Sequence, residues 1–319
     1  MIEEINQVEK MQVFFTGGAG FIGSHVLPKL LNQGHFVKVF DNMSHRGNFE
    51  VIERLKKEFP QQFQLVEGDV RDSLKVYEEM IGSTHVIHFA TVSINKSVAD
   101  PLESGKINFL GNGNVFYAAS KLKVKRVVFA SSASVYGDPI KLPMLESDEL
   151  NPITPYCISK RSGEDLLKYY EGSVGQDWIA LRFFNVYGEG QKTSAYYTSV
   201  INNFVNRIKN GDVPMIEGSG EQSMDFVHVD DVAEAVCLAL NSKSACMPIN
   251  IGTGVSTTIA QLADILLRAV GSEKLPVFSD RKVLVSRRQA DITRAYEVLN
   301  WKPKINVEVG MRGLISGEQ

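Results

Sequence analysis

The chain has 319 residues, of which 44% are hydrophobic and 22% are charged. This length and composition are typical of a folded protein with one large domain, or with a large domain and a smaller lobe, and they exclude a largely disordered chain. The formal net charge of -3 argues against nucleic acid as the main partner, because nucleic acid usually requires a basic face.

Cysteine usage and the first residues bear on metals, location and membranes. The three cysteines are scattered without a CxxC spacing, so we expect neither a disulfide framework nor a metal site. Residues 1–10 are acidic and polar, which predicts a short appended tail rather than a signal peptide. No stretch approaches the ~18 apolar residues of a membrane span. We therefore expect a cytoplasmic protein that does not contact a membrane.

Short apolar runs alternate with helical patterns through the first half of the chain. The strand-like runs cover residues 11–16, 36–41, 63–69, 85–90 and 126–132. The helical patterns between them cover residues 24–33, 49–59 and 103–121. This alternation predicts βαβ units, and the nearly continuous apolar strands fit a parallel sheet that helices cover on both faces. The expected fold class is α/β, with a doubly wound parallel sheet.

The composition changes after residue 184, where the chain becomes richer in Gly, Asn, Tyr and Ser. We place the start of a smaller lobe at this change. The expected division is a first domain at residues 11–184 and a C-terminal lobe at residues 185–319, with segments near 226–252 returning to the first domain.

Three further elements are expected in the second half. Residues 230–240 are typical of a helix capped by Asp230, and residues 258–270 of another helix. Residues 247–254 are typical of a strand. The chain is therefore expected to cross between the two parts more than once.

The segment TGGAGFIGSH, residues 16–25, follows an apolar strand and opens a helix. It satisfies both G-x-x-G-x-x-G and G-x-G-x-x-G. Glycines at these spacings permit a tight turn whose backbone N–H groups approach a pyrophosphate, while the helix N-terminus adds partial positive charge. The pattern predicts a Rossmann-type dinucleotide site. The expected contacts in this segment are Gly17, Gly20, Phe21, Ile22 and Gly23.

Asp41 ends the next strand, about 20 residues further on, where a carboxylate accepts hydrogen bonds from an adenosine ribose. The carboxylate would repel the 2′-phosphate of NADP, so the expected cofactor is NAD. Arg46 is close enough in sequence to keep NADP as the alternative.

A second informative region joins a serine-rich strand end, residues 131–134, to a Tyr-x-x-x-Lys pattern at Tyr156 and Lys160. The Tyr and Lys are four residues apart and would share one face of a helix. An ammonium beside a phenol lowers the phenol pKa from about 10 toward working pH, and a cationic nicotinamide would act in the same direction. Serines at the end of a buried strand face ligands in open α/β sheets. The pattern predicts an acid/base pair.

These motifs resemble, in order and spacing, the extended short-chain dehydrogenase/reductases, and especially the NAD-dependent nucleotide-sugar epimerases and dehydratases of the UDP-glucose 4-epimerase type. The motifs that carry the resemblance are TGGAGFIGSH, DN at 41–42, GDVRD at 68–72, SSASVYG, PYCISK, LRFFNVYG, FVHVDDVAEA and ADITRAYEVLNWKP. They span nearly the whole chain. The resemblance implies a Rossmann-type domain with a substrate-binding lobe, and epimerisation of a nucleotide-diphosphate sugar, favouring C4 of a UDP-hexose through a transient 4-keto intermediate.

The resemblance also implies residue roles. Tyr156 would be the base, Lys160 its modulator and a ribose contact, and Ser132 the hydroxyl that hydrogen-bonds the sugar oxygen. Asn185 and Arg281 would hold the diphosphate of the substrate. The further cofactor contacts would be Asn42, Asp69 and Val70 on the adenosine side, and Phe89 and Ala90 along the cofactor. The long helices near 103–121 and 156–171 would form the four-helix interface of a homodimer.

Related chemistries leave alternatives. Where 4,6-dehydratases carry an Asp-Glu pair, this chain has Ala133 and Ser134, so dehydration is disfavoured. UDP-uronate decarboxylases carry a Glu at the position of Ser134, but the run Arg287-Arg288-Gln-Ala-Asp291 is similar to their Arg-Arg-x-Pro-Asp run. Decarboxylation, or another reaction through a 4-keto sugar nucleotide, is therefore the alternative. A non-catalytic NAD-sensing protein is the second alternative, although such a protein is expected to lack the Tyr or the Lys.

Two departures from the family pattern, and the position of one arginine, bear on substrate choice. Met224 stands where the family usually has an Arg, and its thioether cannot pair with a phosphate oxygen. Val283 and Leu284 stand where Gly-Asp or Gly-Glu usually follows the Arg, so we expect a rearranged diphosphate clamp. Arg288 falls near the position that gates sugar size, where a guanidinium could receive a uronate or narrow the pocket.

Overall fold

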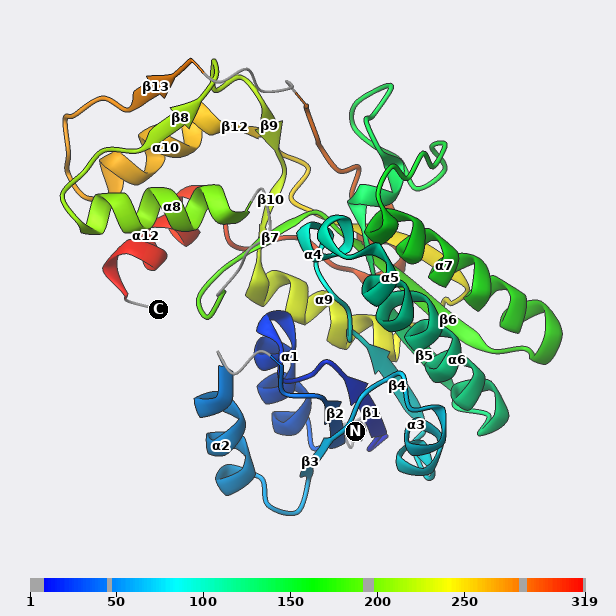
Figure 1. Ribbon diagram of the computed structural model, residues 1–319. Helices are drawn as coiled ribbons and strands as arrows, with labels where there is room; N and C mark the ends of the chain where they lie inside the picture. The colour runs from blue at the N-terminus through cyan, green and yellow to red at the C-terminus, as the bar shows by residue number, and fades with distance from the viewer. Residues whose placement is uncertain (1–8, 45–47, 192–197, 281–285, 318–319) are drawn as a thin grey trace, which may run out of the picture.

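A seven-stranded parallel sheet forms the centre of the larger part of the protein (Figure 1). The computed structural model describes residues 9–44, 48–191, 198–280 and 286–317. The strands follow the order β11-β6-β5-β4-β1-β2-β3, which places the crevice for ligands between β1 and β4, at the carboxyl ends of the strands. The predicted doubly wound Rossmann sheet is confirmed. The strands are β1 (Gln12–Thr16), β2 (Phe36–Asp41), β3 (Phe63–Glu67), β4 (His85–His88), β5 (Arg126–Ser132), β6 (Asp177–Phe183) and β11 (Met247–Ile251).

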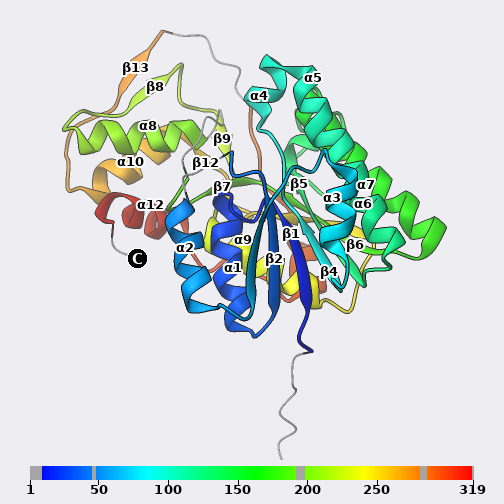
Figure 2. The same cartoon turned by 60° about the horizontal axis from the view of Figure 1, so that its bottom comes forward.

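Helices cover both faces of this sheet (Figure 2). The first face carries α1 (Phe21–Asn32), α2 (Phe49–Glu58), α9 (Val229–Asn241) and α11 (Thr293–Leu299). The second face carries α3 (Ser73–Met80), α6 (Gly111–Lys121) and α7 (Pro155–Val174). Among the described residues, we find no helix with the length and apolar character that a membrane span requires.

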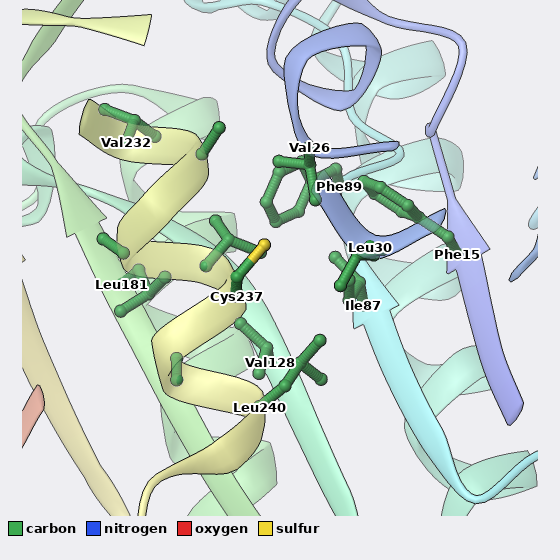
Figure 3. Packing of buried hydrophobic residues seen from close by; sticks show 14 of the residues in the cluster. Phe15, Val26, Leu30, Ile87, Phe89, Val128, Leu181, Val232, Cys237 and Leu240 are labelled. Atoms are coloured by element: carbon green, nitrogen blue, oxygen red, sulfur yellow. The ribbon is translucent and has the colours of Figure 1, made fainter. Parts of the chain in front are cut away.

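The first face is packed by α1 and α9, which lie side by side over the sheet (Figure 3). Val26 and Leu30 of α1 approach Cys237 and Leu240 of α9 above strand residues such as Val128. All of these side chains are almost fully buried. Adjacent strand residues point to opposite faces, so the second face has its own core. Phe14, Phe40, Phe116, Phe129 and Trp178 belong to that core.

The helical pattern expected over 103–121 is divided into three consecutive pieces. They are α5 (Pro101–Ser104), the π-helical turn η2 (Gly105–Leu110) and α6, and the short helix α4 (Ile94–Ala99) precedes them. Asn108 lies in the π-helical turn, and its Oδ1 accepts a hydrogen bond from the Val92 backbone at 2.9 Å. Since π-helical turns insert an extra residue and often occur at functional sites, this one redirects a side chain toward the segment after β4.

The smaller lobe has its own core around Phe204, Ile216, Met224, Leu262 and Met311. Its strands form short pairs, β10 with β7, β12 with β9 and β13 with β8. The elements are β7 (Asn185–Tyr187), α8 (Thr198–Lys209), β8 (Met215–Glu217), β9 (Ser223–Met224), β10 (Phe226–His228), β12 (Thr257–Thr258), α10 (Ile259–Ala269), β13 (Val277–Ser279) and α12 (Val307–Ser316). We propose that the boundary between the first domain and the C-terminal lobe lies between residues 184 and 185. Because α9, β11 and α11 pack on the large sheet, these segments return to the first domain.

Two helix starts differ from the sequence-based expectation. The first helix begins at Phe21, three residues early, because Gly20 caps it in an extended conformation. Asp230 is not the cap of α9. The helix begins at Val229 and is capped by His228, whose Nδ1 accepts from the Asp230 backbone at 3.2 Å. The Asp230 carboxylate instead meets the His25 ring at 2.8 Å, so a contact between distant segments replaces the local cap.

Candidate active site

The glycine-rich segment forms the turn between β1 and α1. Gly17 has a left-handed backbone with φ of +73°, and a Cβ atom there would lie 2.5 Å from the backbone nitrogen of Ala90. A Cβ atom at Gly23 would clash with the backbone of Gly18. The turn therefore packs directly on the end of β4 and opens the N-terminus of α1 toward the crevice, as a pyrophosphate site requires.

The ends of β2 and β3 lie beside this turn. Asp41 Oδ2 accepts a hydrogen bond at 3.1 Å from a backbone N–H of the glycine-rich turn. Asn42 Nδ2 donates to Asp69 at 3.3 Å. Hydrogen bonds from Arg71, of 2.9 and 2.8 Å to the two oxygens of Asp69, lower the pKa of this carboxyl to about 2. The residues expected to contact ribose and adenine are thus neighbours. Arg46, which suggested NADP, lies outside the described residues.

The other expected cofactor residues line the same edge of the sheet. Phe89 is buried after β4, and the Ala90 backbone donates to Thr16 Oγ1 at 3.4 Å. Phe21 and Ile22 form the first turn of α1 and are partly buried against the core. The side chain of Val70 is buried in the second core, so only its main chain can reach a ligand.

Ser132 ends β5 and caps the short 3-10 turn η3 (Ala133–Tyr136). Its Oγ accepts hydrogen bonds from the Ser134 backbone at 3.2 Å and from the Ser134 hydroxyl at 2.9 Å. A serine oxygen has two acceptor positions and one proton. Because Ser134 occupies both acceptor positions, the Ser132 proton is directed elsewhere, and an interaction of this hydroxyl with the Tyr156 phenol lowers the pKa of the phenol.

Tyr156 and Lys160 lie in the first turns of α7, as expected. Thr154 caps the helix by accepting from the Cys157 backbone at 3.3 Å. The Lys160 ammonium lies 5.4 Å from the centre of the Tyr156 ring and 5.0 Å from that of Phe129. Tyr156 is partly exposed, whereas Lys160 is 3% exposed. The structure therefore brings Ser132, Tyr156 and Lys160 together at the carboxyl edge of the sheet.

The expected acidity of the phenol is wrong for the chain alone. Burial raises the pKa of Tyr156 to about 12, and the hydrogen bond from Ser132 offsets only part of this effect. Burial also lowers the pKa of Lys160 to about 7. Removing both groups from water disfavours both charged forms, so an added positive charge is needed before the phenol can ionise near neutral pH.

The expected substrate residues have mixed outcomes. Asn185 is half-buried at the start of β7, and its Nδ2 donates to the Asp225 carbonyl at 3.2 Å. Arg281, Val283 and Leu284 lie outside the described residues. Met224 is fully buried in the core of the smaller lobe. Its apolar side chain packs inward, so the position usually held by an arginine offers no cation to a diphosphate.

Arg288 contacts the serine turn, which is Ser132 together with η3. Its Nη1 donates to the Ala133 carbonyl at 3.2 Å, and its Nη2 to the Gly137 carbonyl at 3.0 Å. Its Nε is buried without a partner. The guanidinium thus joins the C-terminal segment to both ends of η3, next to Ser132, and both of its Nη atoms donate within the protein.

Sequence reasoning missed two buried polar groups behind the site. The first joins the His88 ring to Thr16 Oγ1 at 2.6 Å and to Asn112 Oδ1 at 2.9 Å. The second joins Glu164 to Arg182. The signal for Glu164 was its spacing, since it follows Tyr156 and Lys160 at further four-residue intervals. For Arg182 the signal was a charged residue inside the apolar run IALRFF.

A cavity of about 380 Å³ lies beside the serine turn, lined by Tyr136 and residues of the 138–151 loop. It contains none of the expected site residues, so volume alone does not identify the site. Within the described parts of the chain, no three His, Cys, Asp or Glu side chains are grouped to hold a metal ion.

The chain is similar to known proteins in sequence and in fold. Residues 13–252 match the family described as the NAD dependent epimerase/dehydratase family. A UDP-glucose 4-epimerase from Thermotoga maritima, solved with UDP-glucose, is 33% identical, with a TM-score of 0.87 over 96% of this chain and 98% of that chain. A UDP-N-acetylglucosamine 4-epimerase from Methanobrevibacter ruminantium, solved with UDP-N-acetylmuramic acid, is 32% identical, with a TM-score of 0.87 over 97% and 98%. UDP-glucuronic acid decarboxylase 1 of Xenopus tropicalis is 29% identical over 98% of this chain and 73% of that protein.

Replacing Gly17 with Ala should weaken NAD binding at least about tenfold, because the added Cβ strains a left-handed backbone and pushes the turn away from Ala90. Gly82→Ala is the matched control. Gly82 has φ of +83° but no atom within 4 Å of an added Cβ, so it shares the strain without the collision. Calorimetric titration with NAD measures both variants, and equal affinities would contradict this account of the turn.

Burial of Lys160 predicts a pH dependence of stability. Above about pH 7 the folded chain releases the Lys160 proton, while the unfolded chain keeps it up to about pH 10. The unfolded state then binds more protons, so the free energy of unfolding should rise with pH relative to Lys160→Met, by up to about 1.4 kcal/mol per pH unit. Urea unfolding across this window measures the difference. Lys168 is exposed on the same helix, so the free energy of unfolding of Lys168→Met should change with pH as that of the wild type does. The same behaviour in Lys160→Met would contradict the prediction.

Proposed function

We propose that the chain, which belongs to the NAD dependent epimerase/dehydratase family, interconverts a nucleotide-diphosphate sugar and its C4 epimer, with a UDP-hexose as the substrate. The observation that carries the proposal is the junction of Ser132, Tyr156 and Lys160 at the same edge of the sheet as the glycine-rich turn. The UDP-sugar 4-epimerases among its relatives support the reaction. NAD is the cofactor of the family.

The residues present fit NAD. The turn at Gly17 packs so closely on Ala90 that no side chain can enter the cradle, and the first turn of α1 directs its N–H groups into it. Asp41 lies against this turn, where a ribose of the cofactor would meet a carboxylate. We assign the pyrophosphate to Gly17, Gly20 and Gly23, the adenosine to Asp41, Asn42, Asp69 and Val70, and the lining to Phe21, Ile22, Phe89 and Ala90.

In the proposed reaction Tyr156 Oη accepts the proton of the C4 hydroxyl. When the sugar is bound, its oxygen would replace the Tyr156 phenol as the acceptor of the single Ser132 proton, because Ser134 fills the acceptor positions of Ser132. NAD held by the glycine-rich turn and the ends of β2 and β3 would supply the hydride acceptor and donor for C4 of the sugar. No net redox change results, and Tyr156 returns the proton at the end of the turnover.

Lys160 controls the charge of the phenol. A neighbouring cation lowers the pKa of Tyr156, and a phenolate in turn raises the pKa of Lys160, so the two groups titrate as a pair. The positive charge of a bound nicotinamide acts on the same pair. Ionisation of Tyr156 is thus coupled to an occupied cofactor site. Asn185 and Arg281 are the residues that we assign to the diphosphate of the substrate.

The serine turn favours epimerisation over the alternatives. Ala133 and Ser134 offer no carboxylic acid next to Ser132, although dehydration needs one to expel water. Decarboxylation of a UDP-uronate stays the alternative because of the Xenopus relative, but Arg288 is already bound to the carbonyls of Ala133 and Gly137. A non-catalytic NAD sensor, the second alternative, would not need the Ser132 and Tyr156 pair.

Tyr156→Phe should retain bound NAD and lose turnover by about a thousandfold, because the ring still packs but accepts no proton. The assay incubates the protein with UDP-galactose, UDP-N-acetylgalactosamine and UDP-galacturonate in turn, and follows the C4 epimer by NMR. Tyr169→Phe, exposed on the same helix, is the control. Turnover by Tyr156→Phe would sink the assignment. Carbon dioxide release from the uronate would favour the decarboxylase, and no reaction of the wild type with any sugar would favour the sensor.

We also propose a homodimer formed through α6 and α7. The two helices lie side by side on the outer side of the second face (Figures 1 and 2). Large apolar side chains on this side are exposed, which is typical of an association surface. They are Leu102, Phe109, Leu110, Tyr117, Ile158 and Tyr169. The family resemblance implies that a second copy of the chain covers this surface.

Leu110→Glu and Ile158→Glu should each shift the protein from dimer to monomer at micromolar concentration, because a buried charge opposes association. Sedimentation velocity measures the masses. Leu275→Glu, exposed in the smaller lobe, should leave the dimer intact. A monomeric wild type, or dimers of both variants, would contradict this interface.

A further inference from the structure

Glu164 of α7 and Arg182 of β6 form a buried ion pair behind the candidate active site. Two guanidinium nitrogens contact the carboxylate, Nε at 3.0 Å and Nη2 at 2.6 Å. The side chains are 8% and 3% exposed. A two-point contact between a planar guanidinium and a planar carboxylate fixes orientation as well as distance, which an apolar contact between the same elements would not do.

The pair is attached to the strand that ends in Ser132. Ser131 Oγ donates a hydrogen bond to Glu164 Oε1, and Ser131 is the register partner of Arg182 on the neighbouring strand. The carboxylate therefore joins α7 to the carboxyl ends of both β5 and β6. Ser131, at this junction, is the residue immediately before Ser132.

The same guanidinium reaches the turn that Ser132 caps. Arg182 Nη1 donates to Tyr136 Oη at 2.9 Å and to the Glu146 carbonyl at 3.1 Å. Tyr136 is the last residue of η3, and its hydroxyl donates to Asn250 Oδ1 at 2.7 Å. Arg182 thus contacts both the helix that carries Tyr156 and the turn that Ser132 caps.

Glu164 shares a helix face with the acid/base pair. It follows Lys160 by four residues and Tyr156 by eight, which places all three on the side of α7 that faces the sheet. A sliding or rotation of α7 that displaced Tyr156 from Ser132 would therefore also break the contacts of Glu164.

We propose that Glu164 and Arg182 are positioning residues for the reaction proposed above, on which this inference rests. They fix α7 relative to β5 and η3, so that the Tyr156 phenol and the Ser132 hydroxyl stay within hydrogen-bond distance. The pair carries no net charge, so it performs this function without opposing the charge of Lys160.

The test removes both charges together, because removing one alone leaves an unpaired buried charge and destabilises the fold. Glu164→Leu with Arg182→Met should fold with a melting temperature near that of the wild type, while kcat for the UDP-sugar falls about 100-fold, as expected for a displacement of about 1 Å at the reacting groups. KM should change less than about threefold. Ser131→Ala should lower kcat in the same direction by a smaller factor.

A matched control lies at the other end of the same two strands. Arg126 and Asp177 are register partners that pair at 3.5 Å, with the arginine side chain 8% exposed. Arg126→Met with Asp177→Asn removes an ion pair between β5 and β6 far from Ser132, although the Asp177 side chain is half exposed. Whatever its melting temperature, the folded control protein should keep wild-type kcat.

A second readout does not depend on turnover. The Ser132 hydrogen bond lowers the pKa of Tyr156, so loosening it should raise that pKa in the NAD complex. The ultraviolet absorbance of tyrosinate, taken with and without Tyr156→Phe in each background, isolates this group. Wild-type kcat and an unchanged Tyr156 titration in the double variant would overturn the proposal. If that variant does not fold, the same two results for Ser131→Ala would overturn it. If the wild type turns over no UDP-sugar, the proposed function fails, while the titration still decides the positioning.

Discussion

Burial of two ionisable groups on one helix face governs the candidate site. Tyr156 and Lys160 are held where neither charge is well solvated, and the pKa of each moves toward its neutral form. A phenol whose pKa is raised in this way stays neutral near neutral pH. In the reaction proposed above, the positive charge of the cofactor would then favour the phenolate, so the proposed chemistry would depend on cofactor occupancy.

The parts of the site that follow from local sequence were predictable. The glycine spacing at residues 17–23 reflects one tight turn and its close approach to the backbone after β4. The place of Asp41 at the end of the second strand follows from the length of a single βαβ unit. The shared face of Tyr156 and Lys160 follows from helical periodicity. The alternation of strands and helices predicted the sheet, because β1, β4 and β5 are buried on both faces and therefore form nearly continuous apolar runs.

The remainder depends on contacts between distant segments. The pKa of Tyr156 was predicted in the wrong direction. Desolvation depends on all the residues that pack around the phenol, and the spacing of residues in the sequence does not reveal them. His228 displaced Asp230 as a cap because the Asp230 carboxylate is used by His25, which is remote in sequence. The contacts of Arg288 with η3 join residues more than 150 positions apart, and no local pattern reports them.

The return of α9 and β11 to the large sheet constrains how the chain becomes folded. The nucleotide-binding part is completed by residues that emerge only after much of the smaller lobe has been made, and Trp301, buried near the C-terminal end, donates to the Asp231 carbonyl of α9. A ribosome-bound fragment ending near residue 184 would expose the apolar side of α1 and an unpaired edge of β6. A cut at that point would leave the large sheet without β11 and its first face without α9, so neither fragment would hold a complete core.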